Sequence, residues 1–182
     1  MPQLSVQSVI SCQRLESIEG ASLALPSPEH AFTHLQFRRF AGCPICHLHL
    51  QQFAARAHEI SNQGIQEIVF FHSTPTALRK YSKALPFPLV ADWRKRYYRS
   101  FGVEASLMSL LHPRAVLSAA RGVLRKGLGL SLKGGPLGLP ADILLDASGT
   151  VRAVKYGRHA DDQWSVDTLL EIAKNAVTPQ TD

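Results

Sequence analysis

Two cysteines separated by two residues stand at the junction between a strand-like segment and a helix-like segment. The run is Gly42-Cys43-Pro44-Ile45-Cys46, and the strand-like segment before it covers residues 34–40. The first turn of a helix stabilises a thiolate, because its free N–H groups and the helix dipole favour negative charge. A cysteine pair with this spacing can close a small disulfide that thiol–disulfide exchange makes and breaks. The junction therefore predicts an α/β chain with redox chemistry at the start of its first helix.

Hydrophobic periodicity predicts the elements around this junction. Strands are expected at 34–40, 65–71, 87–91, 142–146 and 151–156. One helix is expected after the cysteines, up to a turn at 62–64, and others at 76–84, at 93–101 and from Asp161 or Asp162 to 176. Asp92 is a predicted helix cap, and the turn at 146–149 joins a predicted β-hairpin. The predicted order is βαβα, then βα, then ββα.

This order, with a proline just before the hairpin, resembles the thioredoxin fold over roughly residues 33–176. Two segments, 35–46 and 139–146, are similar to the peroxiredoxin-like branch of that fold, the AhpC/TSA-like proteins. The resemblance implies a thiol–disulfide oxidoreductase with one α/β domain over residues 1–182, in which helices flank a central mixed sheet. A basic stretch with helical and glycine-rich parts, at about 103–138, is then an insertion before the C-terminal hairpin.

The cysteine pair is the predicted catalytic centre. Cys43 is the predicted nucleophile because it lies closer to the free amides, and Cys46, one turn further, is the predicted resolving cysteine. The resemblance implies that Leu139–Pro140 is a cis peptide facing the sulfurs, where the backbone of Leu139 pairs with an extended thiol substrate. Phe40 and Trp93 are predicted to shield the pair. The predicted substrate-binding residues are Phe40, Gly42, Pro44, Leu139 and Pro140.

Hydroperoxide reduction is the first alternative activity. Peroxiredoxins proper carry Pro-X-X-X-Thr-X-X-Cys, with an arginine that stabilises the thiolate. If Cys46 is aligned with that cysteine, Cys43 stands at the threonine position; if Cys43 is aligned with it, Phe40 stands there. The arginine usual before the late strand is also absent, and the candidates to replace it are Arg38, Arg39 and Arg158. These departures favour dithiol–disulfide exchange over peroxide reduction.

A non-catalytic metal-binding or redox-sensing module is the second alternative. His47 and His49 lie close in sequence to the two cysteines, and zinc or copper accepts such ligands. The two histidines are expected on different faces of the helix, however, and Cys12 is the only cysteine left for a second pair of ligands. We therefore expect neither a metal nor a cofactor. Cys12 is predicted to be buried.

Composition and charge restrict the partners. A net charge of +6 is modest, so nucleic acid is not an expected partner, and no apolar run is long enough for a membrane helix. Three cysteines do not form a disulfide framework, and the N-terminus has no basic start followed by an apolar run, so a cytoplasmic protein is expected. The expected partners are a thiol or disulfide protein, a small thiol reductant or a hydroperoxide, with a homodimer as a further expectation.

Two basic regions leave alternatives open. Residues 106–141 contain no acidic residue, which suits a lid, a docking face for an acidic thiol partner or a dimer contact, and equally a variable, solvated insertion. Residues 94–99 alternate basic and aromatic side chains, which suits anion binding, although a solvated helix face with buried tyrosines is the favoured interpretation.

Overall fold

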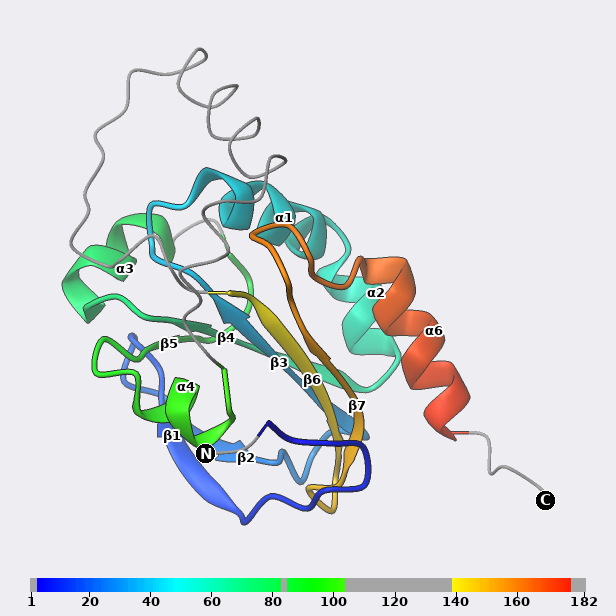
Figure 1. The fold of residues 1–182 in the computed structure, drawn as a ribbon. Coiled ribbons are helices and arrows are strands. Elements are labelled where there is room, and N and C mark those ends of the chain that lie inside the picture. The colour runs from blue at the N-terminus through cyan, green and yellow to red at the C-terminus, as the bar shows by residue number, and fades with distance from the viewer. Residues whose placement is uncertain (1–2, 83–84, 104–138, 178–182) are drawn as a thin grey trace.

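The computed structural model describes residues 3–82, 85–103 and 139–177 and has a five-stranded mixed sheet at its centre (Figure 1). The strand order is β5-β4-β3-β6-β7. β3 and β4 are parallel, as are β4 and β5, whereas β6 is antiparallel to both β3 and β7. The strands are β3 (Phe32–Arg38), β4 (Ile65–Phe71), β5 (Leu89–Ala91), β6 (Ala141–Asp146) and β7 (Val151–Tyr156). The α/β, thioredoxin-like prediction is confirmed.

Both faces of the sheet are covered, so the strands at its centre, β3, β4 and β6, are buried along nearly their whole length. Helices α1, α2 and α6 cover one face, and α4 with a small hairpin of β1 and β2 covers the other (Figure 1). Alternation along β4 divides its side chains, because Val69 and Phe71 pack under the helices while Ile68 and Phe70 pack under the hairpin. The covering elements are α1 (Pro44–Ala55), α2 (Ala57–Asn62), α3 (Pro75–Ser82), α4 (Arg96–Ser100), α6 (Val166–Val177), β1 (Gln13–Glu16) and β2 (Ser22–Leu25).

Most predicted elements are present with small changes at their ends. β3 ends at Arg38 rather than at residue 40, because the chain turns there and the Cys43 N–H donates to the Phe40 carbonyl at 3.1 Å. The helix that follows the cysteines is broken at Arg56, whose φ of −114° and ψ of 19° leave helical geometry between α1 and α2. Gly64, with φ of +70°, ends α2 at the predicted turn.

One expectation about boundaries is wrong, and one element was not expected. α6 begins at Val166, and Ser165 caps it by accepting the Thr168 N–H at 3.1 Å. Asp162 instead accepts the Arg158 N–H and pairs with Lys155 at 2.7 Å, so its carboxylate is not the cap. The β1–β2 hairpin was not predicted, although it buries Leu15 and Leu25 against the sheet.

The predicted insertion at about 103–138 lies outside the described residues, apart from Val103. Within the described part of the chain, none of the helices has the length and apolar character needed to cross a membrane.

Candidate active site

The cysteine pair lies at the edge of the sheet where β3, β4 and β5 all end. Backbone and side-chain bonds tie the three following loops together. The Ala41 N–H donates to Ser73 Oγ at 2.9 Å, and the His72 N–H donates to the Arg39 carbonyl at 3.2 Å. The Asp92 N–H donates to the carbonyl of Phe71 at 2.8 Å. The start of α1 is therefore fixed by its neighbours along the carboxyl edge of the parallel strands.

Cys43 is the N-cap residue of α1. Its Sγ accepts the Cys46 N–H at 3.4 Å, and Pro44 occupies the first turn, where its missing N–H costs no helical bond. A hydrogen bond from the Cys46 thiol lowers the pKa of Cys43 to about 7, assisted by the Cys46 N–H and the charge of Arg39 and opposed by burial. Near neutral pH a large share of Cys43 is therefore thiolate, although its side chain is only 4% exposed.

Cys46 has the opposite character. Its Sγ is 2.8 Å from Cys43 Sγ and donates the hydrogen bond between them. That bond and burial raise the pKa of Cys46 well above its ordinary value, against the charge of Arg38, which lowers it. Both cysteines are free thiols, so the described pair is in its reduced form. The pair is asymmetric, with a thiolate acceptor at Cys43 and a thiol donor at Cys46.

The other predicted site residues lie along the same edge. Phe40 is half-buried, and the Arg39 guanidinium carbon is 5.7 Å from its ring centroid. Gly42 lies beside α3, since a Cβ on it would be 3.5 Å from the Tyr81 hydroxyl. Trp93, in the loop after β5, is 53% exposed, and its predicted shielding role stays a prediction.

Leu139 and Pro140 precede β6, whose Ala141 pairs with Phe37 near the end of β3, so they also lie at this edge. The Pro140 carbonyl accepts the Gly157 N–H at 2.9 Å. The cis peptide bond among the described residues is Leu25–Pro26, so the expectation of a cis Leu139–Pro140 bond is wrong. The backbone at residue 139 reaches the edge without that conformation.

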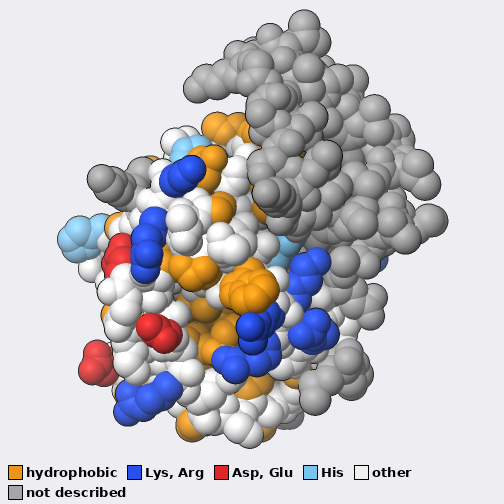
Figure 2. Space-filling model, turned by 90° about the vertical axis from the view of Figure 1, so that its left-hand side faces the viewer, with side chains coloured by type: hydrophobic (Ala, Val, Ile, Leu, Met, Phe, Trp, Pro, Cys, Tyr) orange, Lys and Arg blue, Asp and Glu red, His pale blue; other side chains and the backbone are white. Residues whose placement is uncertain are grey.

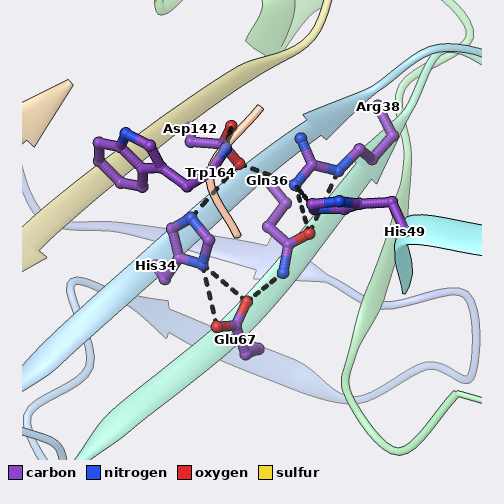
Figure 3. A network of polar contacts seen from close by, with 7 residues as sticks. All are labelled: His34, Gln36, Arg38, His49, Glu67, Asp142 and Trp164. Carbon is purple, nitrogen blue, oxygen red and sulfur yellow. Dashed lines mark hydrogen bonds and ion pairs between the residues drawn. The ribbon is translucent and has the colours of Figure 1, made fainter. Parts of the chain in front are cut away.

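A buried polar network lies under α1 (Figure 3). His34 Nδ1 is 2.9 Å from both carboxylate oxygens of Glu67, and its Nε2 is 3.5 Å from Asp142 Oδ1. Gln36 donates to Glu67 and accepts from Arg38 Nη2 at 2.6 Å. The network therefore links β3 and β4 to Asp142 on β6 with side chains that are almost fully buried.

Arg38 connects this network to the active-site helix. Its Nη2 is 2.7 Å from Asp142 Oδ1 and 3.2 Å from His49 Nε2 on α1. His49 follows Cys46 by one helical turn, and both side chains belong to the buried face of α1. Tyr98, also buried, donates its hydroxyl to the Arg38 carbonyl and, at 2.9 Å, to the Phe70 carbonyl. The cationic Arg38 is thus held close to Cys46, the predicted resolving cysteine.

The protonation states of the network residues depend on burial and on the charges of their neighbours. Burial alone would lower the pKa of His34, but the charge of Glu67 and a hydrogen bond to Asp142 raise it to about 9. Burial opposes ionisation of Asp142, but the charges of Arg38 and His34 hold its pKa below the ordinary range. Burial and the charge of Arg38 lower the pKa of His49 to about 3. At neutral pH His34 is a cation and His49 is a neutral acceptor for Arg38.

Sequence reasoning named Arg38 but missed four other members of the buried network, which are His34, Gln36, Glu67 and Asp142. One signal was present, because His34, Gln36 and Arg38 alternate along a strand and therefore share a face.

Two expectations about the remaining cysteines and histidines are now decided. His47 contacts Gln51 on the exposed side of α1, whereas His49 points inward, so the two face different ways as predicted. Among the described residues no group of three His, Cys, Asp or Glu side chains is arranged to hold a metal ion. Cys12 is exposed, so its predicted burial is wrong.

Comparisons with known proteins agree with this geometry. The AhpC/TSA family matches residues 11–154. Peroxidoxin BcpB from Mycobacterium tuberculosis superposes with a TM-score of 0.70 at 15% identity, covering 95% of this chain and 98% of that one. The bacterioferritin comigratory protein of Xanthomonas campestris, studied for alkyl peroxide reduction, gives 0.63 at 18% identity and 90% coverage of both chains. A Chlorobium tepidum protein assigned as the thiol:disulfide interchange protein DsbE gives 0.62 at 15% identity, covering 97% and 100%. A comparison with curated proteins finds no significant match.

Proposed function

The chain belongs to the AhpC/TSA family and is a thiol-dependent oxidoreductase, and we propose that Cys43 and Cys46 carry its reaction as a reversible dithiol–disulfide pair. The observation that carries the proposal is the hydrogen bond between the two sulfurs, 2.8 Å apart, which divides them into a thiolate acceptor and a thiol donor. The likeness to a protein assigned as a thiol:disulfide interchange protein supports the same chemistry.

The reaction follows from the different protonation of the two cysteines. The Cys43 thiolate attacks one sulfur of a partner disulfide, and the other partner sulfur leaves as a thiolate. Cys46 then loses its proton and attacks Cys43 Sγ, which closes the internal disulfide and releases the second partner sulfur. The protein loses two electrons and the partner gains them, while the released thiolates take up the Cys46 proton and one from solvent. Arg38 assists the second step, because its charge favours the Cys46 thiolate.

Regeneration reverses these steps with a thiol protein or a small thiol as reductant. We place the reaction in the cytoplasm, where cellular thiols keep such a pair reduced between turnovers. Assembly as a homodimer stays a prediction.

Hydroperoxide reduction is the second candidate, favoured by the cationic Arg39 beside the low-pKa Cys43 and by the family. In that reaction the Cys43 thiolate attacks the terminal peroxide oxygen, the O–O bond breaks, and Cys43 becomes a sulfenic acid, while the leaving alkoxide takes up a proton from solvent and departs as an alcohol. Cys46 then attacks the Cys43 sulfur, water leaves, and the same internal disulfide forms. Phe40 carries no hydroxyl at the position where the peroxide motif has threonine, so disulfide exchange is the better supported reaction.

The test follows the disulfide and the substrate together. The reduced protein is mixed with a small disulfide or with a hydroperoxide, quenched by alkylation and weighed by mass spectrometry. Cys43→Ser is expected to abolish reaction with the disulfide, and Cys46→Ser is expected to accumulate a mixed disulfide on Cys43. Cys12→Ser, at an exposed cysteine outside the pair, is the matched control. An unreactive wild-type pair would refute the proposal, and peroxide consumption faster than disulfide reduction would favour the second candidate.

A further inference from the structure

The edge of the molecule that carries Cys43 is strongly cationic. Three described segments follow the parallel strands there: residues 39–55 after β3, 72–82 after β4 and 92–102 after β5. Together they contain one acidic residue, Asp92, and seven basic residues, which are Arg39, Arg79, Lys80, Arg94, Lys95, Arg96 and Arg99. The chain as a whole has 14 acidic residues, so the acidic side chains are concentrated elsewhere.

The one acidic residue faces inward. Asp92 is 4% exposed, and its carboxylate accepts the backbone N–H groups of Arg96, Tyr97 and Tyr98 at 2.7 to 3.1 Å. Its charge is therefore used to hold the start of α4, and it presents no carboxylate to a ligand.

The basic side chains after β5 are held by aromatic rings and backbone oxygens. The Arg94 guanidinium carbon lies 4.5 Å from the ring centroid of Trp93, and that of Arg96 lies 4.9 Å from that of Tyr97. Arg99 Nη2 donates to the Arg94 carbonyl at 2.9 Å. None of the ion pairs formed within the described residues includes Arg94, Arg96 or Arg99.

We call Trp93, Arg94, Arg96 and Arg99 the basic aromatic surface. All four side chains are exposed, and Figure 2 shows basic side chains beside hydrophobic ones on the face to which the parallel strands lead. The expected buried tyrosines of this helix are confirmed only for Tyr98, since Tyr97 is half-buried. An exposed tryptophan among arginines is the composition typical of the residues that dominate binding energy at protein interfaces.

Access to Cys43 requires close approach over this edge. Cys43 is only 4% exposed, so a partner sulfur reaches it only when the partner lies against the surrounding loops. The backbone hydrogen bond from Asp92 to Phe71 fixes the loop after β5 beside the loop after β4. Ser73, in the loop after β4, accepts a hydrogen bond from Ala41 in the loop that carries Cys43. A partner bound at Cys43 therefore extends toward the basic aromatic surface.

We propose that the basic aromatic surface docks an acidic polypeptide segment of the protein that exchanges a disulfide with Cys43. This rests on the proposed function. Guanidinium groups present paired N–H donors that match a carboxylate, and Trp93 offers apolar area for the partner backbone and side chains. The uncompensated positive charge selects an acidic segment and raises its encounter rate.

The test compares thiol peptides that differ only in charge. The oxidised full-length protein is reduced by peptides of equal length in which one cysteine is flanked by Glu, by Ser or by Lys. Each rate is divided by the rate of the same peptide with a small neutral disulfide, because flanking charges alter the reactivity of the thiol itself. At low ionic strength the Glu peptide is expected to react on the order of 10-fold faster than the Lys peptide. Added salt is expected to reduce the ratio toward one.

Matched charge reversals locate the effect. Arg94→Glu and Arg96→Glu are each expected to reduce the Glu-to-Lys rate ratio several-fold. Lys174→Glu changes the net charge by the same amount, but Lys174 lies on α6, on the other face of the sheet (Figure 1). This variant is expected to retain most of the Glu-to-Lys rate ratio. An equal fall in Lys174→Glu would assign the preference to net charge and overturn the proposal.

Three further outcomes are decisive. Equal rates for the three peptides, with normal reduction by dithiothreitol, would overturn the docking proposal and leave the proposed function standing. Failure of dithiothreitol to reduce a Cys43–Cys46 disulfide would instead refute the proposed function. Inhibition of the Glu-peptide reaction by an oligonucleotide at a concentration below that of the peptide would assign the surface to nucleic acid and overturn the proposal.

Discussion

Arg38 and Asp142 form an ion pair of 2.7 Å in which neither side chain has any exposed area. Their separation in sequence is 104 residues, and they join the strand before the cysteine loop to the strand that follows residues 139 and 140. A buried pair is costly to desolvate, so this one persists because each charge has several partners. Asp142 accepts from Arg38 and from the Trp164 N–H, and Arg38 also donates to Gln36 and His49. The pair positions the positive charge close to Cys46.

Asp142→Asn is expected to destabilise the fold strongly. The substitution keeps the shape but leaves Arg38 as an uncompensated buried charge, which typically costs about 3–5 kcal/mol of the free energy of unfolding. Urea titration followed by circular dichroism measures the loss. Asp167→Asn removes one partner of the exposed Arg56 and is the matched control, expected to change stability little. Similar effects of the two substitutions would contradict the buried role of Asp142.

The imidazole of His34 is expected to titrate near pH 9, which is measurable from the pH dependence of its ring proton shifts. Because the folded pKa is raised, its contribution to stability is present below the ordinary pKa of 6.5 and is lost as pH rises toward about 9. In that window the free energy of unfolding falls by on the order of 1 kcal/mol per pH unit.

The cysteines must be removed for this measurement, because the lowered pKa of Cys43 gives a contribution of opposite sign between about 7 and 9. A Cys43→Ser, Cys46→Ser background isolates His34. A ring that titrates near 6.5 in this background would show that Glu67 and Asp142 do not stabilise its charge.

Gly157→Ala is expected to disturb the edge at Pro140. A Cβ at residue 157 would lie 2.5 Å from the Asp162 carbonyl oxygen and 2.8 Å from Pro140 Cγ, so the backbone must shift, at a typical cost of about 1–3 kcal/mol. Gly42→Ala is the control, since its Cβ would meet only ordinary contacts, the nearest at 3.5 Å. Thermal unfolding compares the two. Equal stability of both variants would show that the packing of Gly157 on Pro140 is loose.

Local patterns predicted much of this fold. The run at residues 65–71 is mostly apolar, with β-branched Ile65, Ile68 and Val69, and was predicted with the bounds of β4. Asp92 was predicted as a cap from its position before a helix-forming stretch, and its carboxylate accepts the first N–H groups of α4, although α4 begins later than predicted and its N-cap residue is Lys95. The β1–β2 hairpin was missed because few of its side chains, chiefly Leu15 and Leu25, enter the core. Short strands of this kind are stabilised mainly by packing on the sheet beneath them, which a local sequence pattern does not reveal.

The buried network could not be predicted for a different reason. The sequence places polar residues in β3, and nothing near them shows which partners make their burial tolerable. Glu67 is 33 residues from His34, and both it and Asp142 reach β3 only through strand pairing. The cysteine pair, in contrast, could be identified from the sequence, because both residues and the helix that they begin are contiguous.

The last prediction concerns the cause of the lowered pKa of Cys43. The largest contribution is the hydrogen bond from the Cys46 thiol, followed, after opposing burial, by the backbone of Cys46 and the charge of Arg39. The alkylation rate of the reduced protein is therefore expected to rise with pH around an apparent pKa of about 7. Cys46→Ala removes the thiol donor and is expected to shift this pKa upward, more than Arg39→Met does, because a direct hydrogen bond to the thiolate outweighs a more distant charge. Cys12→Ala, at an exposed site, is the control for alkylation at the third cysteine. If Arg39→Met raised the pKa more than Cys46→Ala, the thiolate would owe its stability mainly to the arginine, and peroxide reduction would become the better supported reaction.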